Sequence, residues 1–425
     1  MNFIEELKWR GMIHDIMPDT EEQLKKRMTS GYIGFDPTAP SLTVGNLVPV
    51  MLLVHFQHAG HKPIALVGGA TGLIGDPSGK SEERKLLPEE KLLHYQERIE
   101  KQLNKFLDFD CGENSAIIIN NKQFYKQIDL FEFFRDIGKH LTVNYMTAKD
   151  SVKNRLEDGM SFAEFSYQLF QAYDFLWLFN NKNCIFQMGG SDQWGNITSG
   201  AELIRKKEGG KAIALTCPLL TKADGTKFGK TEEGNIWLDP QLTSPYKFYQ
   251  FWLNCSDEDA AKFIRIFTTL PKKEIASLEK EHEENPHLRP LQKALAKDIT
   301  IRVHSEEEYA FAVDASDILF GKGTEEALRN LPEKNLLSIF EGVPQSQISL
   351  KDLDNGIGII DFLAEKTTVL PSKNEAHRMI KGGGISINKT KVNDESRMIT
   401  TSDLLNNRYI LVQKGKKNYC LVTVV

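Results

Sequence analysis

Residues 35–47 (FDPTAPSLTVGNL) connect a short apolar run to a longer apolar, periodic segment, and they carry polar side chains that could bind an anion. Their order predicts a strand, a proline-containing loop and the start of a helix. The free N–H groups and the dipole of a helix N-terminus both favour an anionic ligand. This stretch contains neither histidine nor lysine, so Thr43 and Asn46 are the side chains at the expected helix start that could contact the ligand.

A second set of polar residues lies within a strongly apolar segment, residues 161–179 (SFAEFSYQLFQAYDFLWLF). Tyr167, Gln171 and Asp174 share one face of the predicted helix, because the spacing between them is four and then three residues. Polar groups in apolar surroundings need hydrogen-bond partners. The stripe therefore indicates a pocket for a small polar ligand, a buried hydrogen-bond network or an exposed polar face.

Residues 66–81 (LVGGATGLIGDPSGKS) form a glycine-rich stretch after an apolar run. The dinucleotide pattern GxGxxG fails here, because Ala70 and Thr71 stand where a second glycine is required. The P-loop pattern also fails, because its first glycine is replaced by Ile74. A plain glycine turn is one interpretation. A ligand site is the other, because charges of both signs follow, on Asp76, Lys80 and Arg84.

Two later loops offer further binding groups. In residues 187–196 (QMGGSDQWGN), Gly190 permits close approach of a ligand, and Asp192 and Gln193 suit sugar hydroxyls or a carboxylate. Residues 221–231 (TKADGTKFGKT) carry three lysines and two glycines, which predicts a mobile cationic loop. A solvated surface turn is the alternative for this second loop.

No metal site is predicted. His55, His58 and His61 lie three residues apart, a spacing that drifts around a helix, and Gly60 is expected to end that helix. The five cysteines are far apart and form no CxxC pair, which argues against a zinc site or a disulfide framework and fits a reducing cytosol.

The surrounding elements indicate an α/β protein. Strands are predicted at residues 31–35, 63–69, 116–120, 184–190 and 212–216, with helical segments between them. This alternation predicts a mainly parallel sheet covered on both faces, with ligands beyond the carboxyl ends of the strands. Residues 1–16 are expected to form an amphipathic helix rather than a signal peptide. Helical spacing dominates residues 245–345, and a small α+β segment ends the chain.

The 425 residues carry a net charge of −5, with 40% hydrophobic and 26% charged residues, as in ordinary globular proteins. The charge is unevenly distributed. Residues 361–425 hold 11 Lys+Arg against 6 Asp+Glu, a net of +5, and the remainder holds 42 against 52, a net of −10. A basic C-terminal module that meets a polyanion is one interpretation, and an ordinary solvated surface is the other.

Taken together and in this order, the stretches GYIGFDPTAPSLTVGN, LVGGATGLIGDPSGK, FSYQLFQAYDF, QMGGSDQWGN and TKADGTKFGKT resemble bacterial tyrosyl-tRNA synthetases of class I. The resemblance covers nearly the whole chain. TVGN (43–46) stands where class I synthetases carry His-Ile-Gly-His, and KFGKT (227–231) stands where they carry Lys-Met-Ser-Lys-Ser. Residues 372–392 (SKNEAHRMIKGGGISINKTKV) resemble an S4-type RNA-binding segment.

The resemblance implies a function and a domain order. The chain would activate L-tyrosine with ATP to tyrosyl-adenylate, release pyrophosphate, and transfer tyrosine to the 3′-end of tRNA(Tyr). A homodimer, a cytoplasmic location and Mg²⁺ with the phosphates are also implied. The expected parts are a Rossmann-like catalytic domain (1–240), an α-helical anticodon-side domain (241–345), a linker (346–360) and an S4-like RNA-binding domain (361–425).

Residue roles follow from the same resemblance. The tyrosine phenol would meet Tyr32 and Asp174, its ammonium group Asp76, Tyr167 and Gln171, and its carboxylate Gln193, with Thr71 and Asn121 lining the pocket. ATP would be bound by Gly34, Asp36, Gly45, Gly190, Asp192 and Lys230. The catalytic set on the phosphates would be Thr38, Thr43, Asn46, Lys80, Arg84, Lys227, Lys230 and Thr231.

The chain departs from the family pattern at two places. Thr43 and Asn46 replace both signature histidines, and we expect them to act as neutral hydrogen-bond donors. In the S4-like segment, His377 replaces a common arginine, and Lys389 follows Asn388 where glycine is usual. Three alternatives stay open: an RNA-binding protein on an impaired synthetase scaffold, a P-loop NTPase, and a tryptophanyl enzyme.

Overall fold

The computed structural model describes residues 2–79, 87–149, 152–153, 159–226, 228–231, 234–320, 324–341, 343–415 and 418–425, with the backbone alone for residues 230, 231 and 320. The chain forms two compact units. The first comprises Met1–Thr243 and Phe248–Ser305, and the second comprises Ser244–Lys247 and Glu306–Val425. The four-part division expected from the sequence stays a prediction.

A six-stranded sheet forms the centre of the first unit, in the order β1-β6-β5-β2-β3-β4. Its strands are β1 (Asp15–Ile16), β2 (Ser30–Phe35), β3 (Lys62–Val67), β4 (Ile117–Asn120), β5 (Cys184–Gly190) and β6 (Ile213–Cys217). All neighbours are parallel except β1, which pairs antiparallel to β6. The five predicted strands are therefore confirmed, together with the parallel sheet.

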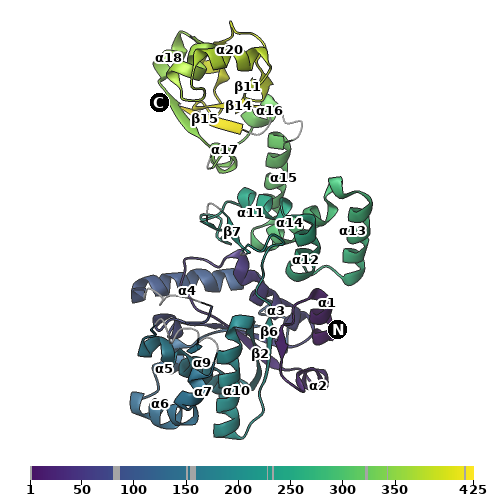
Figure 1. Cartoon of the computed structure of the whole chain (residues 1–425), viewed down its shortest axis with the longest axis vertical. Coiled ribbons are helices and arrows are strands. Elements are labelled where there is room, and N and C mark those ends of the chain that lie inside the picture. The colour runs from purple at the N-terminus through teal and green to yellow at the C-terminus, as the bar shows by residue number, and fades with distance from the viewer. Residues whose placement is uncertain are drawn as a thin grey trace. The chain divides into compact units, whose positions relative to one another are not determined.

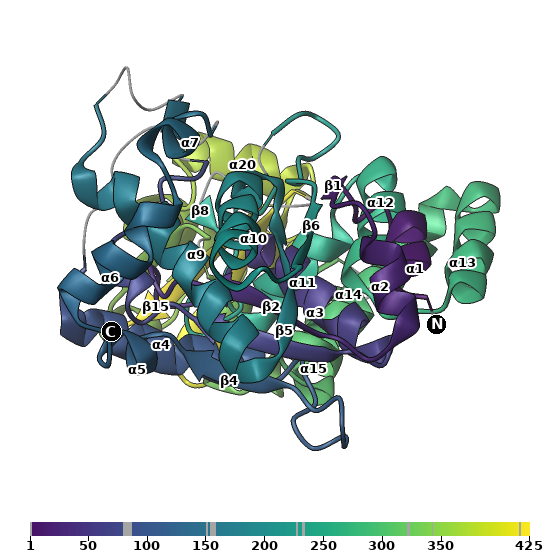
Figure 2. The same ribbon diagram turned by 90° about the horizontal axis from the view of Figure 1, so that it is seen from below.

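Helices cover both faces of this sheet, which explains why its strands are apolar on both sides. Figures 1 and 2 show α3 (Leu47–His58) on one face and α9 (Phe162–Lys182) and α10 (Trp194–Glu208) on the other. Other helices among the described residues before 210 are α1 (Phe3–Arg10), α2 (Thr20–Lys26), α4 (Glu89–Leu103), α5 (Lys122–Tyr125), α6 (Leu130–Asp136), α7 (Val143–Thr147), η1 (Val44–Asn46), η2 (Thr71–Leu73), η3 (Gly138–His140) and η4 (Ser191–Gln193).

The N-terminal prediction was partly wrong. The helix expected over residues 1–16 ends at Arg10, where Gly11 takes the left-handed conformation that often closes a helix. Residues 15 and 16 then form strand β1 at the edge of the sheet. The charge pattern could not reveal this two-residue strand, because its partner β6 lies about 200 residues away in the sequence.

The segment after the sheet is helical, as predicted. It contains α11 (Pro245–Leu253), α12 (Asp257–Phe267), α13 (Lys272–Glu284), η5 (Pro286–Leu288), α14 (Pro290–Val303) and α15 (Glu306–Phe320). A short hairpin of β7 (Lys230–Thr231) and β8 (Gly234–Asn235) precedes these helices. Within the described part of the chain, none of the helices combines the length and the apolar character that a bilayer crossing requires.

The second unit has its own five-stranded sheet, ordered β12-β11-β14-β15-β9, and its own apolar core. Its strands and helices are α16 (Glu325–Arg329), α17 (Glu333–Ile339), β9 (Gln345–Ile348), α18 (Leu350–Asp354), β10 (Ile357–Gly358), α19 (Ile359–Asp361), η6 (Phe362–Lys366), α20 (Lys373–Lys381), β11 (Ile385–Ile387), β12 (Thr390–Lys391), β13 (Met398–Ile399), η7 (Thr401–Asp403), β14 (Tyr409–Lys414) and β15 (Asn418–Val424). Residues 346–360, expected as a linker, thus contribute to β9, α18 and β10.

The turn that departs from the family pattern has left-handed backbone at both Asn388 (φ 48°) and Lys389 (φ 72°). A lysine is strained there, since glycine adopts this conformation most easily. The Lys389 side chain has a compensating role: its Nζ donates to the Leu319 carbonyl (2.5 Å) and to the Tyr419 hydroxyl (2.7 Å). The lysine therefore connects this turn to the end of α15.

Candidate active site

A cluster of buried polar side chains, Asp174 among them, lies beyond the carboxyl ends of β2, β3 and β4. Asn121 follows β4 and directs its amide nitrogen to both Asp174 oxygens (3.4 and 3.2 Å) and to the Thr71 hydroxyl (3.0 Å). Burial raises the pKa of Asp174 well above its usual value, although hydrogen bonds from Asn121 and Tyr125 act in the opposite direction. A ligand that donates a further hydrogen bond to Asp174 would stabilise its carboxylate form and so lower this pKa.

Tyr32 lies near Asp174 in this cluster. Its side chain is buried, and among the described residues its hydroxyl has no hydrogen-bond partner. Burial, followed by the charge of Asp174, raises the pKa of this hydroxyl well above its ordinary value. A buried hydroxyl without a partner is costly, so this group is suited to a ligand that supplies the missing bond.

Asp36, directly after β2, connects Thr71 to Tyr167 on α9. Its Oδ1 accepts from the Thr71 hydroxyl (2.7 Å), and its Oδ2 accepts from the Tyr167 hydroxyl (2.8 Å). These bonds explain the glycine at position 68, since a Cβ there would lie 1.8 Å from Asp36 Oδ1 and 2.5 Å from the Thr71 hydroxyl. Asp36, expected among the ATP-binding residues, therefore belongs to the network that contains Thr71 and Tyr167.

A second group of polar side chains surrounds Asp76. Gln193 donates to Asp76 Oδ2 (2.6 Å), and Gln171 donates to Gln193 Oε1 (3.3 Å). Asn196 lies among them on α10, with its amide nitrogen 3.3 Å from Asp76 Oδ1 and 3.0 Å from Gln171 Oε1. Tyr167 and Gln171, one turn apart on α9, thus contact the loops after β2 and β5, on one helix face as predicted.

Sequence reasoning missed three members of these networks. Asn196 is buried and also contacts the Ser78 hydroxyl (3.2 Å), and Tyr125 influences Asp174 from α5. Asn196 and Ser78 were within the glycine-rich stretches singled out above. Neither was identified, because a single asparagine or serine in a turn more often bonds to its own backbone than to a distant side chain.

Residues 41–46, here called the signature segment, have a specific hydrogen-bond arrangement. Asn46 Oδ1 accepts from both the Thr43 backbone N–H (2.9 Å) and the Thr43 hydroxyl (2.8 Å). The amide NH₂ of Asn46 is therefore directed away from Thr43, and Asn46 is exposed. In this geometry the Thr43 hydroxyl proton is used by Asn46, and the expectation that both residues act as donors stays a prediction.

The helix N-terminus here is less open than expected. Val44 N–H donates to the Ile236 carbonyl (3.0 Å), and Asn46 N–H donates to the Thr43 carbonyl (2.9 Å). Gly45 is exposed, and no partner of its N–H is found among the described residues. The donors that this segment offers to an anion are thus the Gly45 N–H and the Asn46 amide.

The lysine loop packs against this segment. Gly229 has a φ of 79°, and a Cβ on it would lie 2.9 Å from Val44 Cγ2 and 3.4 Å from the Gly45 nitrogen. Ile236 N–H donates to the Gly229 carbonyl (3.1 Å), and Thr43 forms a bridge with Trp237. Two stretches about 185 residues apart in sequence, 41–46 and 229–238, therefore lie side by side.

Other expected site residues are also accounted for. Gly34 is exposed at the end of central strand β2, where a Cβ would meet no described atom within 4 Å. A Cβ on Gly190 would lie 2.6 Å from Asp192 Oδ1, so these two are adjacent. Thr38 lies in the loop after β2, where its N–H donates to the Asp36 carbonyl (2.8 Å). Lys80, Arg84 and Lys227, and the side chains of Lys230 and Thr231, lie outside the described residues.

The three histidines do not form a metal site. His61 stacks on Phe56 with ring centroids 4.7 Å apart, and its Nδ1 accepts from the Thr29 N–H (3.3 Å). His55 is buried, and burial lowers its pKa well below the usual value. Among the described residues, no group of three or more His, Cys, Asp or Glu side chains is arranged to hold a metal.

Comparison with known families gives two matches. Residues 24–321 match the tRNA synthetases class I (W and Y), and residues 335–422 match the tyrosine–tRNA ligase SYY-like C-terminal domain. The chain is 65% identical to the tyrosine–tRNA ligase of Cytophaga hutchinsonii over 99% of both chains. It is 61% identical to that of Porphyromonas gingivalis and 55% identical to that of Flavobacterium johnsoniae, each over 100% of both chains.

Solved structures give a consistent result. A C-terminally truncated mitochondrial tyrosyl-tRNA synthetase from Aspergillus nidulans superposes with a TM-score of 0.66 and 31% identity, over 73% of this chain and 92% of that chain. A tyrosyl-tRNA synthetase from Archaeoglobus fulgidus, complexed with L-tyrosine, shares the fold with a TM-score of 0.54 and 16% identity, over 74% and 100% of the two chains.

Proposed function

Because this chain belongs to the tyrosine–tRNA ligases of the class I aminoacyl-tRNA synthetases, we propose that its cluster of buried polar side chains lines a pocket that binds tyrosine and that segments 41–46 and 229–238 bind ATP beside it. The reaction is that of the family: the enzyme activates tyrosine with ATP and transfers it to tRNA. Residue roles, the metal, the oligomer and the location are proposals.

The tyrosine phenol would enter the end of the pocket that contains Tyr32 and Asp174. This assignment rests mainly on the buried Tyr32 hydroxyl, which has no partner among the described residues and lies in the field of Asp174. A substrate phenol can donate to the carboxylate and accept from Tyr32, so both groups gain a bond. Phenylalanine or tryptophan would leave these polar groups unpaired, which favours tyrosine over the tryptophanyl alternative.

The other end of the pocket would hold the amino-acid head group. Asp76, Tyr167 and Gln171 would contact the α-ammonium group, and Gln193 would lie near the carboxylate. Tyrosine would then compete with existing bonds, because Gln193 donates to Asp76 and Tyr167 donates to Asp36 before the ligand binds. We add Asn196 to this set, since its amide bonds to both Asp76 and Gln171.

ATP would lie over the signature segment. The Gly45 N–H and the Asn46 amide would donate to its phosphates, Asp192 and Gly190 would lie near the ribose, and the lysines of residues 227–231 would approach the pyrophosphate. Thr43 would act indirectly by holding Asn46 Oδ1 and so directing the amide NH₂ outward. A lysine loop that closes after ATP binds suits this role.

The first chemical step needs no general base, because the attacking carboxylate is already ionised near neutral pH. The oxygen attacks the α-phosphorus, and pyrophosphate leaves with the electrons of the broken bond. Negative charge builds on the phosphates as the phosphorus becomes five-coordinate. Neutral N–H donors and lysines that bind this charge most tightly in the transition state would therefore lower the barrier.

Mg²⁺ would be held chiefly by the phosphates. Among the described residues, acidic, histidine and cysteine side chains form no cluster for a metal. This fits an ion that takes most of its ligands from phosphate and water, with few from the protein. When bound, it would neutralise part of the charge on the leaving pyrophosphate.

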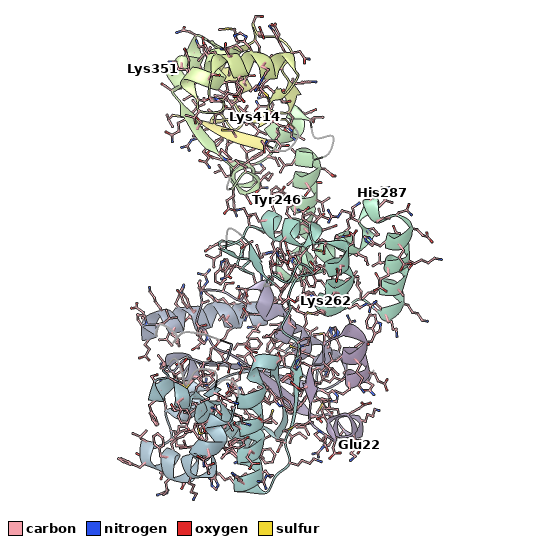
Figure 3. All side chains as sticks on the ribbon, in the orientation of Figure 1. Glu22, Tyr246, Lys262, His287, Lys351 and Lys414 are labelled. Atoms are coloured by element: carbon pink, nitrogen blue, oxygen red, sulfur yellow. The ribbon has the colours of Figure 1, made fainter. Side chains whose placement is uncertain are left out.

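tRNA binding would involve the second unit, whose last 65 residues carry a net charge of +5. An excess of lysine and arginine favours contact with a phosphate backbone. Lys351 and Lys414, labelled in Figure 3, are two of the cations of this unit. A cytoplasmic location would fit its five free cysteines, because thiols persist in reducing compartments.

We also propose a homodimer. Helix α6 exposes Leu130, Phe131 and Phe134, and Phe162 at the start of α9 is 70% exposed. The opposite faces of these two helices meet in one core cluster through Phe133 and Leu169. Large apolar side chains gathered at the surface typically mark a protein interface, and a second copy of this chain is the partner that the family suggests.

Tyrosine-dependent exchange of labelled pyrophosphate into ATP tests the assignment, with phenylalanine and tryptophan as controls and Mg²⁺ present. Exchange with tyrosine alone is expected, and it would establish that a Thr43/Asn46 signature supports activation. A folded sample that exchanges with none of the three would contradict the roles assigned here. The impaired, RNA-binding scaffold would then be the better description.

A further inference from the structure

The signature segment is hydrogen-bonded to helix α4, which contributes no residue to the expected site. Gln102, in the last turn of α4, is buried. Its Oε1 accepts from the Leu42 N–H (2.9 Å), and its Nε2 donates to the Ser41 hydroxyl (2.8 Å). One amide side chain therefore satisfies two buried groups immediately before Thr43.

Ser41 links this hydrogen-bond network to residues 238–239, which follow the lysine loop. Its hydroxyl donates to the Leu42 carbonyl (2.7 Å) and accepts from the Asp239 N–H (3.2 Å), in addition to the bond from Gln102. The hydroxyl is thus saturated, with one bond donated and two accepted. Leu238 N–H also donates to the Leu42 carbonyl (2.9 Å), so residues 41–42 and 238–239 are joined directly.

A second residue on the same face of α4 reaches the same place. Arg98 lies one turn before Gln102 and forms an ion pair with Asp239, and both side chains are largely buried. Residues four apart share one face of a helix, so Arg98 and Gln102 act side by side. Helix α4 therefore contacts residues 41–42 through Gln102 and, through Arg98, it contacts Asp239, which directly follows the second stretch proposed to hold ATP, 229–238.

We infer that Gln102 is a positioning residue for adenylate formation. It holds the signature segment and residues 236–239 in the relative position that ATP binding requires. The inference rests on the proposed assignment of Asn46 and Gly45 to the phosphates. Gln102 touches no reacting group. It fixes the backbone from which the Gly45 N–H and the Asn46 amide project, and small displacements of such donors weaken transition-state binding strongly.

The chemistry of the side chain matters because both of its atoms are used. Only an amide of this length supplies an acceptor for Leu42 and a donor for Ser41 at once. In Gln102→Met, the volume is nearly kept and both bonds are lost. In Gln102→Glu, the acceptor for the Leu42 N–H is kept and the donor is lost. The two variants thus separate the hydrogen bonds from packing.

The test combines binding and rate measurements on the full-length enzyme. Tyrosine affinity is measured without ATP, and adenylate formation is measured in single turnover over a range of ATP concentrations. For Gln102→Met we expect kcat/KM for ATP to fall at least about tenfold while tyrosine affinity stays within about twofold. Gln102→Glu should fall at least as far as Gln102→Met, because its buried carboxylate faces the Ser41 oxygen without a donor.

Asn104→Ala is the matched control, because Asn104 lies on the same end of α4 and is exposed. It should leave both measurements unchanged. Ser41→Ala gives a second route, since combining it with Gln102→Met should cost little beyond either change alone if the two residues act through one network. Fully additive losses would contradict the inference.

The outcomes distinguish this inference from its premise. Equal losses in tyrosine affinity and ATP-dependent rate would indicate general damage to the fold and would overturn it. A loss in Asn46→Asp with none in Gln102→Met would overturn the inference alone. No loss in either variant would overturn the assignment of residues 41–46 to ATP, and the inference with it.

Discussion

In the proposed assignment, Asn46 and Thr43 together take the place of the two histidines that are usual in the family. The backbone N–H and the hydroxyl of Thr43 both donate to Asn46 Oδ1, and this orients the Asn46 amide so that its NH₂ group faces outward. A neutral amide donates as well as an imidazole does, and its protonation does not change with pH. We therefore expect adenylate formation to lack the pH dependence that a signature histidine would introduce near its pKa.

Asn46→Ala should slow adenylate formation by about 1–3 kcal/mol of transition-state binding, the range for one lost hydrogen bond to a charged group. Asn46→Asp is the sharper variant, because it keeps the acceptor for Thr43 and replaces the outward donor with a charged oxygen. It should be slower than the alanine variant, since the carboxylate repels phosphate. Single-turnover kinetics measure both, and an active Asn46→Asp enzyme would disprove the donor role.

Asp174, which we propose contacts the tyrosine phenol, lowers the stability of the folded protein. Its folded pKa is raised, mainly by burial, so the folded protein holds this proton more tightly than the unfolded chain does. Stability is then lost as pH rises from the unfolded pKa near 4 through the folded value, and the full cost is present above it. The Asp174→Asn variant does not titrate at this position.

We therefore expect Asp174→Asn to be more stable than the wild type by about 1–3 kcal/mol at neutral and alkaline pH, with the gain disappearing toward pH 4. Calorimetric melting in a series of buffers measures this difference. Asp19→Asn is the control: Lys211 lowers the pKa of this exposed carboxyl, so its removal should give no gain. A wild type that is more stable than Asp174→Asn across the whole range would refute the argument.

At the scale of elements, sequence patterns predicted the strands and helix faces that depend only on residues close together in the sequence. The five central strands are short apolar runs bounded by glycine, proline or asparagine, and the stripe on α9 has helical spacing, so each could be identified from neighbouring residues. Strands β1 and β9 could not, because each depends on a partner strand elsewhere: β6 for β1 and β15 for β9. The same limit hid Asn196 and Gln102, whose roles arise from tertiary contacts.

Helix α1 is anchored by one buried arginine. Arg10 Nη1 donates to the carbonyls of Arg265 (2.6 Å) and Thr268 (2.9 Å), and Nη2 donates to that of Leu270 (3.0 Å). It also pairs with Glu6 through Nε (2.8 Å). The guanidinium thus occupies carbonyls at the end of α12, which have no partner within that helix.

Arg10→Met should lower the free energy of unfolding by about 2–3 kcal/mol, because buried carbonyls and Glu6 lose their donor while the apolar stem is kept. Urea unfolding measures this change. Lys8→Met on the same helix is the control, since the Lys8 side chain is 59% exposed, and it should change stability by no more than about 0.5 kcal/mol. Equal effects of the two changes would contradict an anchoring role.

At the scale of the whole molecule, the apolar surface of α6 predicts the oligomeric state. Phe131 is 81% exposed, an unusual position for a large aromatic side chain in a monomer. The wild type should sediment as a dimer of 48.2 kDa chains, and Phe131→Asp or Phe162→Asp should dissociate it, because burying an unpaired carboxylate is costly.

Leu288→Asp, at a 47% exposed leucine of η5, is the control for that experiment and should leave the dimer intact. Analytical ultracentrifugation over a range of concentrations separates the cases. A monomeric wild type, or a dimer that tolerates both phenylalanine changes, would place any interface elsewhere.

The two units predict a separation of the two chemical steps. In the proposed assignment, tyrosine activation uses residues of the first unit, and tRNA binding involves the second unit, whose residues 361–425 carry a net charge of +5. Arg378 on α20 and Lys391 on β12 are exposed cations of the S4-like segment. Charge reversal there should weaken tRNA binding without reaching the pocket.

For Arg378→Glu combined with Lys391→Glu, we expect an unchanged rate of pyrophosphate exchange and a kcat/KM for tRNA lower by at least about tenfold at moderate salt. The slope of log affinity against log salt should become shallower by about 0.7–0.9 for each phosphate that the variant no longer neutralises. Lys351→Glu makes the same kind of charge change on α18, outside that segment. If it impairs tRNA use equally, net charge rather than this segment directs the binding, and if exchange itself falls, the steps are not separated between the units.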